Sequence, residues 1–537
     1  MSSLLRNSAA LAGSLVVMTA LPPAAWAQGV TAQELWAAWQ DGVALAGGTL
    51  SASESREGNQ LVLQDLRLDM GDEAGMLQLE VMKLVNQADG SVAVILPDRF
   101  PLMFELPDAP ADAPGADSGP ENGPEKVFIT VDAPDLNLVV QGLGERAEFQ
   151  AAAPTMTLTL DRFVPAIPPE AGAVTASVVL DSFVLRYLQD LATDVPLIDA
   201  AVSFDTLNAR VAVGKNASGS AEMAARLGKS SAGFSGAMPV NSPALQEAEA
   251  AMAGGNFPVA AWLALLDAGM RGKVSLSLGD AEFTGDVTEI TAGTATTPTT
   301  WDIGFATLDL ALGVDATKIG YSTVLKGTQF LLTGDIPDFP ADSMSYGIGE
   351  YRIGLEAGLN GLTKPQDWSA AYVMRDITMS DEMWHLISNG TELPHEPLTL
   401  ALDLGGRYGV QPEMLKPGWT PVDAGQPFSE FSFKINEMKL AGLGVLSTGQ
   451  GGLGFDFSDL VTFDGLPLPS GRVSILTTGA YGLIDLMAKA GQITAEDVQG
   501  ARAALLMVGR AGEAPDTLHT EVDFREKGLF LNGIKIR

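Results

Sequence analysis

The sequence predicts a mainly β fold (α+β) in which elongated, curved antiparallel sheets carry a few packing or capping helices. Three observations support this fold class. Apolar and polar residues alternate with a period of two in many segments, which is typical of strands that bury one face. Helical patterns are few and do not alternate regularly with the strands, which argues against a doubly wound parallel sheet. The chain also has 59 glycines and 31 prolines, which indicates many turns.

The first 27 residues have the three-part layout of a bacterial secretory signal peptide. Arg6 provides a cationic start, an apolar run follows over residues 9–21, and Ala25-Trp26-Ala27 forms a small-x-small cleavage site. The apolar run is only about half the length that spans a bilayer. We therefore expect cleavage after Ala27, no transmembrane segment in the mature chain, and a periplasmic location.

Composition restricts the classes of partner. The formal net charge is −34, and no run of Lys or Arg interrupts it. Because binding to phosphate groups relies on a positive patch, we expect no nucleic-acid partner. The chain has no cysteine, which excludes disulfides, thiol nucleophiles and cysteine metal sites.

The first element after the signal peptide is expected to be a helix. Thr31 and Glu34 have the spacing of a capping box, in which each side chain satisfies a free backbone N–H group. Gly47-Gly48 ends the pattern. Four apolar residues recur between them at helical spacing: Leu35, Trp36, Trp39 and Val43. We expect this helix to dock on a sheet through its tryptophans.

Period-two alternation then dominates the chain. The expected strands contain these apolar sets: Leu61/Leu63, Leu66/Leu68/Met70, Val92/Val94/Leu96, Val127/Ile129/Val131, Leu136/Leu138/Val140, Met156/Leu158/Leu160, Val274/Leu276/Leu278, Leu308/Leu310/Leu312, Leu398/Leu400/Leu402/Leu404, Val522/Phe524, Leu529/Leu531 and Ile534/Ile536. The one-residue slip between the first two sets indicates a bulge or turn. Residues 518–537 are expected to form a two-stranded hairpin, with Phe524 and Leu531 buried and Gly528 taking the positive φ of its turn.

Further helices and two linkers complete the expected elements. The candidate helices are residues 244–253, 259–270, 381–388, 481–490 and 495–508. Thr494 is the expected N-cap of the last helix, with Asp497 three residues on as a weaker capping box, and Gly509 is its stop. Residues 108–125 predict a flexible acidic loop, and residues 291–300 resemble a linker. We expect a signal peptide at 1–27, a β-rich N-terminal half at 28–240, and a helix-plus-β half at 241–537.

Motifs for known chemistries are missing from the sequence. There is no G-x-S-x-G elbow for a serine nucleophile, and His385, His395 and His519 have no metal-site spacing. Residues 449–454 (GQGGLG) match a dinucleotide-binding pattern by letter, but strand-like residues follow, which predicts a glycine-rich hairpin turn. We therefore predict no catalytic, cofactor-binding or metal-binding residue and no cofactor.

Both ends of the mature chain resemble one family. The residues that carry the resemblance are 31–39 with the strands around 61–68, and, at the other end, 482–485, 495–508 and 523–533. They are similar to the domain-of-unknown-function 2125 family of exported Gram-negative bacterial proteins, over nearly all of the mature chain. The shared motifs are structural and imply no catalytic residue. A more distant resemblance is to AsmA-like envelope proteins, which implies a β-rich fold associated with outer-membrane lipid handling.

The leading hypothesis is a non-enzymatic periplasmic envelope protein that offers an apolar β surface or groove to lipid or to a protein partner. A large exposed apolar patch would favour it. One alternative is a periplasmic hydrolase with paired carboxylates, which requires raised pKa values in one pocket. The other is a purely structural or assembly protein, in which every sheet face is closed.

Overall fold

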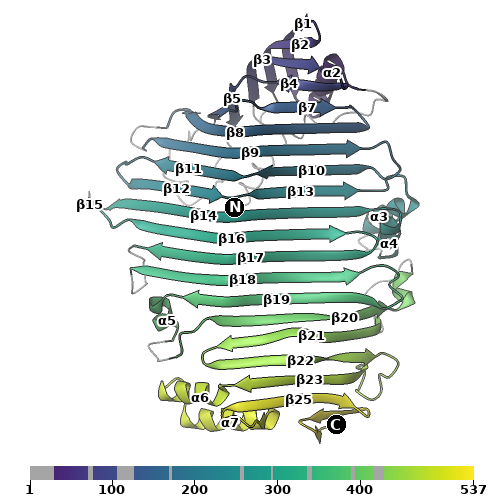
Figure 1. Ribbon diagram of the computed structural model, residues 1–537, viewed down its shortest axis with the longest axis vertical. Helices are drawn as coiled ribbons and strands as arrows, with labels where there is room; N and C mark the ends of the chain where they lie inside the picture. Colours follow the sequence, from purple (N-terminus) through teal and green to yellow (C-terminus); the bar gives the residue numbers. More distant parts are fainter. Residues whose placement is uncertain are drawn as a thin grey trace. The chain divides into compact units, whose positions relative to one another are not determined.

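The computed structural model describes residues 29–69, 76–105, 126–167, 172–253, 259–291, 294–334, 342–388, 393–416 and 428–537. The signal peptide with Ala27 and the acidic loop 108–125 lie outside these ranges. Most described residues belong to antiparallel strands, and helices are few (Figure 1). The prediction of a mainly β fold is therefore confirmed, whereas its elongated form stays a prediction.

The chain divides into two compact units. The first comprises residues 1–236 and 278–301, and the second comprises residues 237–277 and 302–537. Three strands contribute residues to both units: β13 (Ser230–Ala237), whose last residue belongs to the second unit, β14 (Arg271–Thr291) and β16 (Thr299–Val314).

In its described residues, the first unit begins with one helix and continues almost entirely in strands. Its strands pair antiparallel, and β8 and β9 form the longest hairpin. Besides its part of β14 and β16, its elements are α2 (Ala32–Leu45), β1 (Thr49–Glu57), β2 (Gln60–Asp69), β3 (Met76–Asn86), β4 (Ser91–Ile95), β5 (Arg99–Glu105), β6 (Lys126–Asp132), β7 (Asn137–Gln141), β8 (Arg146–Val164), β9 (Val174–Asp190), β10 (Leu197–Phe204), β11 (Thr206–Val213), β12 (Gly219–Leu227), β13 (Ser230–Ala237) and β15 (Thr294–Ala295).

Helix α2 packs on the first strands as predicted. Thr31 and Glu34 form the capping box, and Trp36 and Trp39 are buried in one cluster with the inward residues of β2, β3 and β4. The N–H of the buried Trp36 indole ring donates to the Glu54 carboxylate (2.7 Å), so the polar group of this ring is satisfied. The predicted slip in β2 is also confirmed, because Asp65 takes a φ of +52° between two buried apolar pairs.

The second unit is built mainly from long hairpins that follow chain order. From β17 to β23 each strand pairs antiparallel with the next, and β23 pairs with β25. Its elements are α3 (Pro243–Ala253), α4 (Val259–Asp267), β17 (Lys318–Thr333), β18 (Ser343–Gly358), β19 (Gln366–Met379), α5 (Asp381–Ile387), β20 (Leu398–Val410), the 3-10 helix η3 (Pro412–Leu415), β21 (Phe428–Gly442), β22 (Val445–Asp456), β23 (Leu468–Thr478), α6 (Ala480–Lys489), α7 (Ala495–Val508), β24 (Arg510–Ala511), β25 (Thr517–Arg525), β26 (Gly528–Leu531) and β27 (Ile534–Lys535).

The five predicted helices of this part of the chain are all present, with α4 ending three residues early. Thr494 caps α7 in a box with Asp497, and Gly509 follows its last turn. Helices α3 and α4 bury Leu265 and Leu266 in a small cluster of their own.

The terminal hairpin differs from its prediction in two ways. Val522 pairs with Leu531 as expected, but the residues with positive φ in the turn are Glu526 (+52°) and Lys527 (+58°), not Gly528. A third strand, β27, also pairs with β26.

The buried side chains of β25 differ from the prediction as well. The buried residues are Leu518 and Asp523, and Asp523 is held by Arg472 (2.9 Å) and Arg525 (3.5 Å), whereas Phe524 and Leu531 are only half-buried.

One glycine-rich stretch, and parts of one threonine-rich stretch, are strand rather than turn or linker. Residues 449–454 lie inside β22 and pair with β21 and β23. A Cβ on Gly451, which has a φ of +118°, would collide with the carbonyl oxygen of Arg472, so glycine here permits close strand pairing. The expected linker at 291–300 contains β15, which pairs back on the end of β14, because threonines favour strands even in a sequence without apolar periodicity.

Candidate functional site

In the second unit, one face of strands β17 to β21 is apolar. Residues directly opposite one another in an antiparallel pair project to the same face, so the register defines rows of side chains that cross the strands. No position in the four rows that follow carries a charge. The rows are Leu325–Tyr351–Met374–Leu400–Leu440, Thr323–Ile353–Tyr372–Leu402–Met438, Tyr321–Leu355–Ala370–Leu404–Ile435 and Ile319–Ala357–Trp368–Gly406–Phe433. We call this set the apolar face.

Many side chains of the apolar face are accessible to solvent. Six large ones are between 40% and 56% exposed: Ile319, Leu355, Tyr372, Leu400, Leu402 and Leu440. A sheet face that belonged to a closed core would bury such residues, as α2 and its strands bury Leu61 and Leu63 in the first unit. An apolar surface of this extent is typical of a binding site.

Aromatic rings form a cluster beside these rows. Trp368 stacks on Phe431 with centroids 5.4 Å apart, and Phe431 in turn contacts Phe428 and Phe455. The indole N–H of Trp368 donates to the Ser432 carbonyl (3.0 Å), so its polar group is satisfied within the sheet. The rings supply rigid apolar area with little loss of side-chain entropy.

The first unit has an apolar face of the same type. Its rows cross β8, β9, β11, β12 and β14, and none of their positions is charged: Leu158–Val178–Ala209–Ala225–Phe283 and, from β9 to β14, Ala176–Val211–Met223–Gly285. Val211 (37%) and Met223 (48%) are exposed. Trp301 lies where a Cβ on Gly285 would be, so the glycine makes room for the indole ring.

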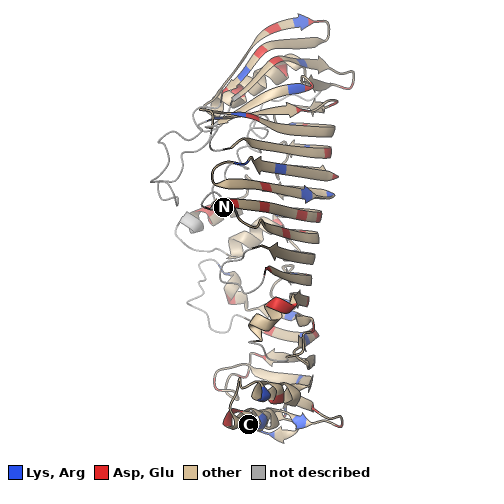
Figure 2. Cartoon of the chain, turned by 90° about the vertical axis from the view of Figure 1, so that its left-hand side faces the viewer, with Lys and Arg blue, Asp and Glu red and all other residues tan. Residues whose placement is uncertain are grey.

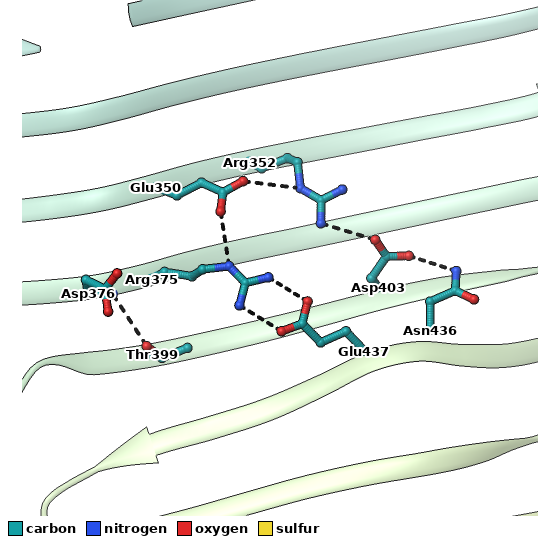
Figure 3. Close-up of polar contacts among 8 residues, drawn as sticks. All are labelled: Glu350, Arg352, Arg375, Asp376, Thr399, Asp403, Asn436 and Glu437. Carbon is teal, nitrogen blue, oxygen red and sulfur yellow. Dashed lines mark hydrogen bonds and ion pairs between the residues drawn. The ribbon is translucent and has the colours of Figure 1, made fainter. Parts of the chain in front are cut away.

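The opposite face of the second unit is polar and carries a network of five charged residues (Figure 3). Arg375 on β19 binds Glu350 on β18 (Nε to Oε2, 3.0 Å) and, through both terminal nitrogens, Glu437 on β21 (2.7 and 2.5 Å). Arg352 lies between Glu350 (3.7 Å) and Asp403 (3.1 Å). Asn436 donates to the other oxygen of Asp403 (2.9 Å), which completes the network.

Hydrogen bonding stabilises the charged forms within this network. Arg375 lowers the pKa of Glu437 below its usual range, chiefly by donating hydrogen bonds to the carboxylate. Glu437 and Glu350 raise the pKa of Arg375. A general acid would need a raised carboxyl pKa, which is the opposite direction.

The network covers an apolar residue of its own face. Val373 is fully buried, lies opposite Arg352 in register, and is two residues from Arg375 on the same face of β19. The methylene stems of arginine cover apolar surface while their charged ends stay hydrated. The polar face is therefore closed by its own side chains, whereas the apolar face is not.

The three histidines named in the sequence analysis belong neither to the rows of the apolar face nor to the charged network. His395 stacks on Trp384 of α5 at 4.9 Å, and its two ring nitrogens contact Asp381 (2.9 Å) and the Met379 carbonyl (3.0 Å). His385 lies on α5 and His519 on β25. Among the described residues, no group of three or more His, Cys, Asp or Glu could hold a metal ion.

Figure 2 shows acidic and basic positions spread along the strands of both units. Within the part of the chain that the structure describes, no helix has the length and apolar character needed to cross a membrane.

The comparison with protein families gives one match. Residues 437–536 match the family described as an uncharacterized protein conserved in bacteria, DUF2125. The predicted family resemblance is confirmed for these residues, whereas its extent over nearly all of the mature chain stays a prediction. The DUF2125 match runs from the end of β21 to β27 and includes helices α6 and α7, which carried part of the predicted resemblance. The resemblance to AsmA-like proteins stays a prediction. No curated protein and no solved structure matches the chain.

The DUF2125 segment contributes to both faces of the second unit. Met438 and Leu440 belong to the apolar face, and Glu437 belongs to the network on the polar face. The sequence predicted the alternation of Leu400, Leu402 and Leu404, which all lie on the apolar face, but it named no site residue there. Period-two alternation shows that a strand has one apolar side, whereas only the register shows which strands align those sides.

Proposed function

We propose that this protein is a non-enzymatic periplasmic envelope protein whose apolar sheet faces bind the acyl chains of lipids. The observation that supports this best is the contrast between the two faces of β17 to β21. One face has exposed leucines and aromatic rings and no charge in its four rows, and the other has a network of paired charges. The periplasmic location rests on the expected signal peptide.

The dimensions of the apolar face suit an acyl chain. Five strands spaced by about 4.8 Å span about 19 Å, and the four rows cover about 20 Å along the strands. Half of the hydrocarbon core of a bilayer is about 15 Å thick, which is the length of an acyl chain in place. A chain of this kind needs no hydrogen-bonding partner, and the side chains of the rows offer none apart from Thr323, Trp368 and three tyrosines.

The electrostatics favour binding over hydrolysis. The carboxylates of the network are ion-paired, and the pKa of Glu437 is lowered rather than raised. The rows of the apolar face supply no charged group that would attract a peptide. An uncharged apolar ligand is thus the best match to this surface.

The test is lipid binding by the purified mature protein. We expect phospholipid or fatty acid in organic extracts of protein isolated from the periplasm, identified by mass spectrometry, and binding of a fluorescent phosphatidylethanolamine. Leu355→Asp with Leu402→Asp places two charges on the apolar face and should weaken that binding at least about tenfold, because each leucine loses its apolar contact.

Ser322→Asp is the matched control, since Ser322 is exposed on the polar face of β17 opposite Gly354. It adds one such charge to the opposite face and should leave lipid binding unchanged, whereas Leu355→Asp alone, which adds the same single charge, should weaken it. If no lipid co-purifies and the two leucine substitutions change nothing, the proposal is wrong and a structural or assembly role takes its place.

A further inference from the structure

Strand β1 lies at an edge of the first unit. Among the described residues it pairs antiparallel with β2 and packs beside α2, and no other strand pairs with it (Figure 1). All residues from Ser53 to Glu57 are exposed. The outer side of an edge strand presents main-chain N–H and C=O groups that no neighbouring strand satisfies, so it can pair with a strand of another chain.

The turn that follows β1 determines which of its main-chain groups point outward. Glu57 and Gln60 lie directly opposite one another across a two-residue turn, in which Gly58 has a φ of +63°. In such a hairpin the pair next to the turn exchanges both of its hydrogen bonds, and the pairs beyond it alternate. The main-chain groups of Glu54 and Arg56 therefore point away from β2, to the free edge.

Two side chains of opposite charge stand on this edge. Glu54 and Arg56 are two residues apart, so they project to the same face of β1. One oxygen of the Glu54 carboxylate accepts a hydrogen bond from Trp36 Nε1 (2.7 Å), which holds the side chain in place. Arg56 has no ion-pair partner in the part of the chain that the structure describes. The edge thus offers a fixed anion and an unpaired cation.

Only one antiparallel register of two β1 strands matches these charges. When Ser55 lies opposite Ser55 of a second copy, each Glu54 lies opposite Arg56 of the other copy. Glu57 then faces Ser53, so no like charges oppose one another. A shift by one step of the ladder places Glu54 opposite Glu54, or Arg56 opposite Arg56. Opposite charges stabilise a cross-strand pair and like charges destabilise it, so the charges select the register centred on Ser55.

We propose that β1 pairs antiparallel with β1 of a second copy, around Ser55, to form a symmetric dimer. The order Glu54-Ser55-Arg56 is its own complement in an antiparallel pair, which argues for a second copy as the partner. Because the contact is two-fold symmetric, the Glu54–Arg56 ion pair and its main-chain hydrogen bonds each occur twice. The short ladder indicates a weak dimer, with a Kd on the order of 10–100 µM. The inference is independent of the proposed function, because it uses no residue of either apolar face.

The first experiment is cross-linking through an introduced cysteine. The chain has no cysteine of its own, so Ser55→Cys provides a single thiol, which the proposed register places opposite the same thiol of the second copy. Directly opposite residues that exchange no hydrogen bonds have Cα atoms about 4.5 Å apart, which a disulfide can bridge. Mild oxidation with diamide should give a covalent dimer on a non-reducing gel.

Ser53→Cys is the matched control for cross-linking, because Ser53 is exposed on the same face of the same strand. In the proposed register its thiol lies about 13 Å along the strand from the thiol of the second copy, too far for a disulfide. It should cross-link at least about tenfold more slowly than Ser55→Cys.

The second experiment is sedimentation equilibrium of the mature protein at about 0.15 M salt, which screens the repulsion between two acidic chains. Wild-type protein should show a monomer–dimer equilibrium. Arg56→Glu places like charges opposite each other twice and should raise the Kd at least about tenfold, and Glu54→Lys should do the same. An equimolar mixture of these two variants should recover dimerisation, because opposite charges then face each other again.

Arg67→Glu is the matched control for charge. Arg67 is exposed on β2, away from the free edge, and its substitution changes the net charge by the same amount as Arg56→Glu. It should leave the Kd unchanged. Because all of the substituted positions are exposed, circular dichroism should show that the variants remain folded.

The proposal is wrong if wild-type protein remains monomeric up to about 300 µM, several times the expected Kd. Equal cross-linking rates for Ser53→Cys and Ser55→Cys, or an unchanged Kd for Arg56→Glu, would also overturn it. So would a chain that stays monomeric and instead captures an extended peptide of another protein on β1. Arg56→Glu should bind lipid as wild type does, so this test and the test of acyl-chain binding can fail separately.

Discussion

Arg375 and Glu437 pair through two hydrogen bonds that pass over an intervening strand. Arg375 lies on β19, Glu437 lies on β21, and β20 runs between them. A bidentate arginine–carboxylate pair is among the stronger polar contacts in proteins because both charge and geometry are matched. Here it joins three strands on the polar face, above the buried Val373.

Removing the arginine from this pair should destabilise the second unit. We expect Arg375→Met to lower the free energy of unfolding by about 1.5–3 kcal/mol, because Glu437 and Glu350 both lose a charged donor in a half-buried position. Chemical denaturation measures the change. In a double-mutant cycle with Glu437→Gln, the two effects should be less than additive. Lys318→Met is the control, since the Lys318–Glu356 pair is more than half exposed and should change stability by less than about 1 kcal/mol.

The same pair should give the protein an acid-dependent stability. The pKa of Glu437 is lower in the folded protein than its usual value of 4.5. Its contribution is therefore complete above about pH 4.5 and is lost as the pH falls through the lower, folded-state value. We expect unfolding free energies measured from pH 7 to pH 3 to fall less steeply for Arg375→Met than for wild type. Equal slopes would show that Arg375 does not set the pKa of Glu437.

Two leucines provide a matched comparison of a closed core and an open face. Leu63 is fully buried beneath α2, and Leu355 on the apolar face is 56% exposed. Leu63→Ala should destabilise the protein by about 2–5 kcal/mol through lost contacts and the cavity left behind. Leu355→Ala should change stability by no more than about 0.5 kcal/mol. Thermal unfolding of both variants distinguishes the cases, and a large effect at Leu355 would mean that the apolar face is part of a core.

The cap of α7 should contribute measurably to stability. The Thr494 hydroxyl accepts from the Asp497 amide, and the Asp497 carboxylate accepts from the Thr494 amide. We expect Thr494→Ala to lower the free energy of unfolding by about 1 kcal/mol. Thr494→Ser keeps the hydroxyl and should retain most of the stability, which chemical denaturation can verify.

The turn between β25 and β26 offers a stabilising substitution. Glu526 and Lys527 both have positive φ, which is unfavourable for side chains of this kind. Asn adopts this conformation more readily, so Glu526→Asn should raise the free energy of unfolding by about 0.5 kcal/mol. The substitution keeps Lys527, whose contact with Asp459 would be lost if that residue were changed. A decrease in stability would show that the Glu526 side chain has a favourable role.

The sequence predicted well what depends on local chemistry. The capping boxes at Thr31 and Thr494 were found from spacing alone, because a cap needs only residues three positions apart. The slip at Asp65 was found because it shifts the apolar alternation. Likewise, the alternating leucines of β20 predicted a strand with one apolar side.

Features that depend on neighbouring strands could not be predicted in this way. The position of residues 449–454 within β22 depends on contacts with Arg472 and Phe433, which are close only after the strands pair. Asp523 is buried because two arginines neutralise it, so its position could not follow from hydropathy. The network around Arg375 joins four strands, and only the register brings its members together.

The order of strands in the second unit has a consequence for folding. From β17 to β23 every strand pairs with the one that precedes it in the chain, so each new strand has a template as soon as it is available. Strands that are neighbours in sequence pair at low sequence separation, which favours rapid folding for a β protein. The sheet can therefore grow by successive addition of hairpins, in the way that repeat arrays extend from a nucleus.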